Sequence, residues 1–385
     1  MHMPARSNPR QGRSAGHRAA ACAALAAASW TAPAQAHVKW FAPYFVEAPP
    51  QQIGRTLENP WFWTGIALVL AFFVVTRAFE RTAAGQAVLG GIDRVTHPLW
   101  LRLDDFMRAV IAAFFVAIFA VGGIYLTPDL QTPHEWVSWM QLLIAALVFS
   151  RRTMPLAAAG ILLLWVLALR DYEFFHLLDY LALGVAVAAY LVLESSGREH
   201  WRCYRFEVLR WGVAIALMWS SLEKFAYPDW FYPVVEEKPF LTFGMPRDVF
   251  IPMAGVAEFT MGFGLLWTAL VRRLSAIALF VIFNAAVYPF GRIDLVGHAL
   301  IMGVIVAIAA DPTPQIRYAI RRPVWSIPPS LVSALLVFAG AYWGLHALLY
   351  DPAAAADRPA RTLDPAQAEH PTHAVHPRPQ PPPGR

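Results

Sequence analysis

The chain has 385 residues, of which 57% are hydrophobic and only 15% are charged, and its mean hydropathy is +0.44. Soluble domains are about one-quarter charged, so this composition excludes an ordinary soluble protein and predicts an integral membrane protein. A net charge of +5 would suggest nucleic acid in a soluble chain. Here the arginines stand in short loops between apolar segments, which is how membrane orientation is encoded. We therefore expect the lipid bilayer as a partner and no nucleic acid.

The first residues, 1–36, are typical of a secretory signal peptide. Arginines precede the apolar run "AAACAALAAASW", and Ala34-Gln35-Ala36 provides the small residues of a cleavage site. The apolar run is shorter than the roughly 20 residues that span a bilayer. Cleavage after Ala36 would leave an exported segment, 37–60, that begins with His37.

Ten further apolar runs of near membrane length predict ten spanning helices. We place them at 61–78, 106–126, 135–150, 153–170, 174–194, 205–223, 249–270, 273–290, 294–310 and 329–349. With the mature N-terminus outside, every arginine-rich loop falls on the inner side, as the positive-inside rule requires. The sequence therefore predicts a multi-pass protein of the bacterial inner membrane with both mature ends in the periplasm.

The chain also shows signs of an internal repeat. Residues 151–191 and 272–310 share an Arg-Arg start, a short outer loop with Arg and Asp, and a polar residue five positions before a glycine. Those polar residues are Asp179 and His298. Extended backward, the repeat gives two four-helix units in the same orientation, a device that membrane proteins use.

The predicted fold is therefore an all-α polytopic transmembrane helix bundle. The units are 106–194 and 205–310, with one flanking helix at each end, 61–78 and 329–349. The Pro/His-rich tail, 351–385, has little apolar surface to bury, and we expect it to be an exported disordered segment.

Residues 205–310 carry a recognisable set of motifs. They are Arg210 early in the first helix, Glu223-Lys224-Phe225 at its outer end, "AGVAEFTMGFGLL" around Glu258, and the helix with Asp294, His298 and Gly303. In these features the segment resembles the DoxX-like family of small four-helix membrane proteins. Residues 106–194 look like a degenerate second copy without the Glu-Lys-Phe element. The resemblance implies association with a membrane redox complex, including quinone-linked ones, and a subunit rather than a stand-alone enzyme.

Glu258 lies about nine residues into its helix, hence roughly 13 Å along it. An acid at that depth is costly and usually faces a partner or a cavity. It is read either as a proton-accepting or quinone-contacting carboxyl, or as a structural carboxyl that links helices.

Glu223 and Lys224 stand at the outer boundary of their helix. Adjacent helical residues point about 100° apart, so the two are not expected to pair with each other. Glu223 could meet Glu258, Asp294 or His298, whereas Lys224 either faces the bundle or extends to the membrane surface.

Two helices carry a histidine close to a carboxylate. Asp294 and His298 are at i, i+4 on one face, and His176 stands near Asp179 and Tyr180. Proton relay, hydrogen bonding to a quinone head and plain helix–helix bonding all remain open for these groups. His176 and His298 could alternatively supply two axial haem ligands.

Histidines at the two exported ends raise the possibility of copper. A terminal His37 would offer its amine and imidazole to one ion, and the tail adds His370, His373 and His376. The alternative is that His37 is an accident of cleavage and that the tail is a solvated extension.

The segment 225–248 is rich in aromatic residues and proline. Trp and Tyr favour the headgroup level of a membrane, so we expect an interfacial cap in which Trp230, Phe231 and Tyr232 shield the polar groups from bulk water.

Three functions follow from these observations. The first is a redox-system subunit that binds a quinone or similar amphiphile near Glu258 and His298; the others are a transporter or periplasmic copper-handling protein, and a membrane scaffold. Nucleotide-binding, Cys-x-x-Cys and Ser-His-Asp motifs are absent, and two cysteines, Cys22 and Cys203, exclude a disulfide framework.

Overall fold

The computed structural model describes residues 38–42, 44–313 and 326–350. Within these ranges every regular element is a helix, and the only β pairing is an isolated bridge between Ile124 and Gln131. The prediction of an all-α protein is confirmed.

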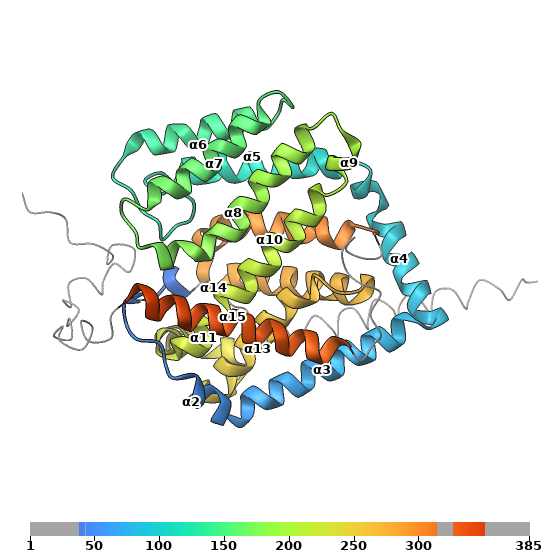
Figure 1. Cartoon of the computed structure of the whole chain (residues 1–385), viewed down its shortest axis with the longest axis vertical. Coiled ribbons are helices and arrows are strands. Elements are labelled where there is room, and N and C mark those ends of the chain that lie inside the picture. The colour runs from blue at the N-terminus through green and yellow to red at the C-terminus, as the bar shows by residue number, and fades with distance from the viewer. Residues whose placement is uncertain (1–37, 43, 314–325, 351–385) are drawn as a thin grey trace, which may run out of the picture.

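The long helices form the body of the molecule (Figure 1). They are α3 (Pro60–Glu80), α4 (Ala83–Trp100), α5 (Leu103–Val121), α6 (Glu135–Leu147), α7 (Met154–Ala168), α8 (Phe174–Ser195), α10 (Arg205–Ser220), α13 (Arg247–Gly264), α14 (Ala269–Ala310) and α15 (Ile327–Leu349). Short helical turns connect them: η1 (Val38–Trp40), α2 (Ile53–Glu58), α9 (Glu199–Arg202), α11 (Glu223–Ala226), η2 (Pro228–Phe231), α12 (Tyr232–Glu237) and η3 (Pro239–Thr242).

Four of the described helices are long and apolar enough to cross a membrane, namely α3, α8, α14 and α15. Helices α6 and α7 are apolar but only 13 and 15 residues long. These helices indicate a membrane protein. Each of the ten predicted runs is helical, yet only four helices in the described part meet both criteria, so the layout of ten spans stays a prediction.

Helix α14 consists of two antiparallel halves. At Gly291 the backbone has φ 73° and ψ −157°, a conformation that side chains with a Cβ rarely adopt. The chain reverses direction there, and contacts between the two ends of α14 show this. Arg272, near its start, donates a hydrogen bond of 2.7 Å to the carbonyl of Asp311, just past its end. The two halves correspond to the predicted spans 273–290 and 294–310.

Helix α4 was not predicted, because residues 83–100 were assigned to an inner loop. It is amphipathic rather than apolar, and Gly85 and Leu89 are its buried residues. Asp93 on its surface forms an ion pair of 2.5 Å with Arg273, which joins α4 to α14.

The packing of the helices matches two repeated units, because the last helix of each predicted unit packs on the first helix of the other. Helix α8 packs on α10, and correspondingly α14 packs on α5. Both contacts are close at a glycine: a Cβ on Gly212 would lie 2.1 Å from the Cβ of Ala186, and one on Gly303 would lie 2.3 Å from Val110. Small residues allow membrane helices this close approach. The duplication itself stays a prediction.

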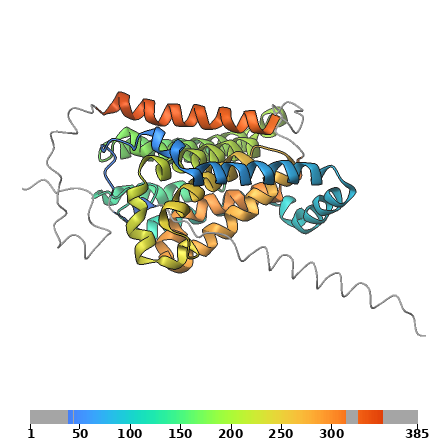
Figure 2. The ribbon, with the colours of Figure 1, turned by 90° about the horizontal axis from the view of Figure 1, so that it is seen from below.

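The two ends of the bundle carry different charges. Arginines predicted to be on the inner side form ion pairs at one end, where Arg151, Arg202 and Arg205 all meet Glu194. Helix α10 leads from this end to the opposite one, where η1, α11 and the turns up to η3 lie. Helix α15 covers one face of the molecule (Figure 2).

Candidate functional site

The N-terminal segment enters the bundle instead of lying outside it. All three residues of η1, Val38, Lys39 and Trp40, are buried. Further along the segment, the Gln51 amide donates to the carbonyl of Ala226 at 2.7 Å. The sequence predicted only that 37–60 is exported, and gave no indication that its first turn belongs to the core.

Lys39 forms the centre of a buried charge cluster. Its ammonium pairs with Asp179 on α8 and, at 2.5 Å, with Glu223 on α11. It also lies 5.7 Å and 5.8 Å from the ring centres of Tyr44 and Trp230, within cation–π range. Burial by itself would lower the pKa of Lys39, but the two carboxylates raise it above its ordinary value. Lys39 is therefore charged, and it holds η1 between α8 and α11.

Glu223 and Lys224 have different partners, as their angular separation predicts. Glu223 pairs with Lys39 rather than with Glu258, Asp294 or His298. Lys224 pairs with Glu258 on α13, and its ammonium lies 4.9 Å from the ring centre of Phe231. Because Lys224 is only 7% exposed, the interpretation that it extends to the membrane surface is wrong.

The predicted pair Asp294 and His298 is confirmed, with Nδ1 of the imidazole 3.1 Å from Oδ1 of Asp294. The imidazole lies between the rings of Trp40 and Phe283, with ring centres 4.6 Å away on each side. Trp40 comes this close because position 297 is glycine: a Cβ there would lie 2.0 Å from the indole. The indole of η1 therefore covers His298.

Asp129, in the loop between α5 and α6, was missed by the sequence analysis. It accepts hydrogen bonds from Trp40 Nε1 at 3.1 Å and from the Tyr180 hydroxyl at 2.5 Å, and lies 3.0 Å from His176 Nε2. The expected grouping of His176 with Asp179 is therefore wrong, because Asp179 turns to Lys39 instead. The available signal was an aspartate in "TPDLQTPHE", an outer loop without basic residues.

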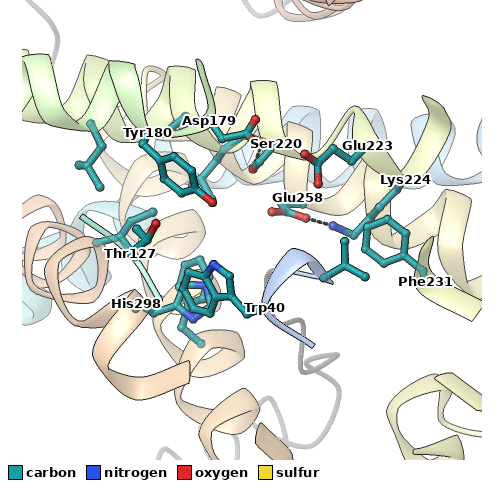
Figure 3. A pocket seen from close by; sticks show the side chains of 17 residues that line it. Trp40, Thr127, Asp179, Tyr180, Ser220, Glu223, Lys224, Phe231, Glu258 and His298 are labelled. Atoms are coloured by element: carbon teal, nitrogen blue, oxygen red, sulfur yellow. Dashed lines mark hydrogen bonds and ion pairs between the residues drawn. The ribbon is translucent and has the colours of Figure 1, made fainter. Parts of the chain in front are cut away.

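These groups surround a polar cavity of about 100 Å³. Helices α8, α10, α13 and α14 form its walls together with η1 and α11 (Figure 3). The polar residues that line it are Thr127, Asp179, Tyr180, Ser220, Glu223, Lys224, Glu258 and His298. Four of the five predicted pocket residues thus share one cavity, and Asp294 stands behind His298. From the first unit, Asp179 and Tyr180 line the cavity and His176 does not.

The polar cavity adjoins a smaller apolar cavity of about 30 Å³. Val38, Lys224 and Phe231 line both of them. The other residues of the apolar cavity are Phe41, Val234, Val235, Leu241, Phe250, Ile251 and Phe290. Several come from η2, α12 and η3, the segment predicted to be an interfacial cap.

The three aromatic residues predicted to shield the polar groups make different contacts. Phe231 reaches both cavities, as predicted. Trp230 instead stacks on Tyr227 at 4.0 Å, and Tyr232 lies under the guanidinium of Arg247 at 4.1 Å.

The described residues offer few side chains that could together ligate a metal ion or haem. Within 38–42, 44–313 and 326–350, no group of three or more His, Cys, Asp or Glu residues could hold a metal ion. His37, His370, His373 and His376 lie outside the described residues. His176 contacts Asp129 and does not line the cavity that His298 lines, so the structure does not bring the two imidazoles to one site as a pair of axial haem ligands.

No family model, curated protein or solved structure matches this chain. The likeness to the DoxX-like family is therefore carried by the motif residues alone.

Proposed function

We propose that this protein is a subunit of a membrane redox system, and that its polar cavity takes the headgroup of a quinone or a similar amphiphile. One observation carries the proposal. Glu258 and His298, which come from α13 and α14, line a single cavity whose walls combine a few polar groups with aromatic rings. Small-molecule sites are commonly built in this way.

The groups on the cavity wall suit a headgroup with carbonyl or hydroxyl oxygens. Ser220, Lys224 and His298 can donate hydrogen bonds to carbonyl oxygens, and Glu258 can accept one from a hydroxyl. Trp40 and Phe283 provide apolar faces for a ring. A cavity of about 150 Å³ holds benzene, so a ring in this cavity of about 100 Å³ requires the aliphatic stem of Lys224 to shift while its ammonium stays near Glu258.

In this proposal the cavity opens toward the periplasmic half of a bacterial inner membrane. The exported N-terminal segment provides part of its wall, and all the polar groups lie at the end of the bundle opposite the arginine-rich loops. A partner subunit would carry the redox chemistry.

Binding of a short-tailed ubiquinone analogue to the purified chain in nanodiscs tests the proposal. The variant is Lys224→Met with Glu258→Gln, because removing one partner alone would leave a buried unpaired charge. We expect at least a tenfold loss of affinity, since a hydrogen bond to a charged group contributes about 1.5–3 kcal/mol.

The chain offers a matched control. Glu237 and Lys238 form an ion pair of 2.5 Å on the cap, with the glutamate side chain 71% exposed. Lys238→Met with Glu237→Gln should leave binding unchanged. Unchanged affinity in the cavity variant, or an equal loss in the control, would contradict the proposal.

A second candidate function is cation transport, which the charge of the cavity wall favours. Three acids, Asp179, Glu223 and Glu258, line the cavity. The two lysines that pair with them, Lys39 and Lys224, leave one negative charge in excess. Proton or sodium flux into proteoliposomes, lost in the same double variant, would support transport. Absence of both quinone binding and flux would leave the scaffold interpretation.

A further inference from the structure

Two neighbouring cavities with different lining residues share three side chains, and we call this place the neck. The polar cavity holds the charged and hydroxyl groups, whereas the apolar cavity has Lys224 as its only polar lining residue. Val38 and Phe231 are the other two side chains at the neck. A site that is polar at one end and apolar at the other matches a ligand of the same form.

The neck can widen without breaking the fold. The ammonium of Lys224 is fixed by Glu258 on the polar side, so its aliphatic stem is what lies beside the apolar cavity. Phe231 belongs to η2, a turn of four residues, rather than to a long helix. Rotation of these two side chains would join the two cavities.

The cap that covers the apolar cavity exposes two aromatic side chains. Phe240 and Phe243, on either side of the lining residue Leu241, are 55% and 53% exposed. Exposed aromatic side chains beside a membrane bundle are typical of segments that lie at the headgroup and acyl boundary. A chain leaving the apolar cavity beneath the cap would therefore enter lipid.

From this geometry we propose that the two cavities form one bipartite site for a single-tailed amphiphile. Its polar head occupies the polar cavity, and the first carbons of its tail pass the neck into the apolar cavity. The inference rests on the proposed headgroup site and adds the substrate class: a ligand with an alkyl or isoprenoid tail, rather than a free polar metabolite.

The test compares two probes, 2,3-dimethoxy-5-methyl-1,4-benzoquinone and its 6-decyl derivative, in the same nanodiscs. The wild-type chain should bind the decyl probe at least tenfold more tightly, as expected for burying two methylene groups. Val235→Trp fills the apolar cavity, so it should lower this preference about tenfold and leave the affinity for the tail-less probe within twofold.

Two further variants make the outcome decisive. Ile251→Phe fills the same cavity from α13 and covers the case in which the cap does not tolerate tryptophan. Val337→Trp on α15, where the valine is 67% exposed, controls for the substitution and for partition of the probe into lipid. An unchanged preference in both filling variants overturns the tail site, whereas a wild-type chain that binds neither probe overturns the headgroup site as well.

Discussion

Lys39 is the residue on which the charge balance of the cavity depends. Its ammonium pairs with Asp179 and Glu223, and all three side chains are at most 3% exposed. Two carboxylates this close repel each other, and burial weakens the screening of that repulsion by solvent. The N-terminal segment therefore contributes the counter-ion that both carboxylates share.

The substitution Lys39→Met should destabilise the protein by about 3–5 kcal/mol, because it leaves two buried carboxylates without their partner. Unfolding by denaturant in detergent measures the loss. Adding Glu223→Gln to this variant should recover part of the stability, since it removes the repulsion with Asp179.

Lys238→Met is the control for this prediction, because Lys238 lies on the cap and pairs with an exposed carboxylate. It should change stability by no more than about 0.5 kcal/mol. Equal losses in the two lysine variants would show that Lys39 has no special role.

The candidate site was partly predictable, for a reason that also explains the misses. Glu258 and His298 stand out because a polar group inside an apolar run is expensive and must have a partner. Lys39 and Asp129 lie in segments that were assigned outside the membrane, where a charge has little cost and gives no signal. Lys39 also meets an acid 140 positions away, a pairing that only the folded chain reveals.

Helix α14 shows how charged groups hold two antiparallel halves together. Arg272 donates hydrogen bonds to the carbonyls of Asp311 and Thr313, at 2.7 Å and 2.6 Å. Arg210 on α10 pairs with the carboxylate of Asp311, which also accepts a hydrogen bond of 2.8 Å from the Thr313 amide. Cations beside the last carbonyls of a helix also favour its dipole.

Asp311→Ala removes this carboxylate and leaves Arg210 buried without its counter-ion. The expected loss is about 3–5 kcal/mol, again measured by unfolding in detergent. Asp248→Ala provides a comparison, because the Asp248 side chain is 78% exposed and its loss should be close to neutral. A mild effect at position 311 would mean that the carboxylate contributes little beside the hydrogen bonds from Arg272 to the main-chain carbonyls.

The helices themselves were predicted with differing success, and hydropathy explains the difference. Long apolar runs such as α3 and α8 were found near their true bounds. Helix α4 was missed because its face toward the bundle is small and it contains Gly90 and Gly91, which lower helix propensity. The break at Gly291 was expected only as a loop, since the sequence does not show that two helices join almost directly there.

The two ends of the molecule carry different groups. The end with α9 and the starts of α5 and α10 carries Arg202 and Arg205, paired with Asp104 and Glu194. The other end carries the two cavities and the cap. From the positive-inside rule we predict that the first end lies in the cytoplasm, which would place the cavities toward the periplasm.

The cysteine content of the chain allows a direct test of this orientation. Cys203 is the only cysteine among the described residues, and it lies at the arginine-rich end between α9 and α10. A membrane-impermeant maleimide added to intact spheroplasts should not label it until the membrane is permeabilised. In a Cys203→Ser background, Glu237→Cys on the cap, where the glutamate side chain is 71% exposed, should be labelled at once. The opposite pattern would place the cavities on the cytoplasmic side and remove the basis for an exported N-terminal segment in their wall. Labelling of both positions in intact spheroplasts would mean that the two ends do not lie on opposite sides of a membrane.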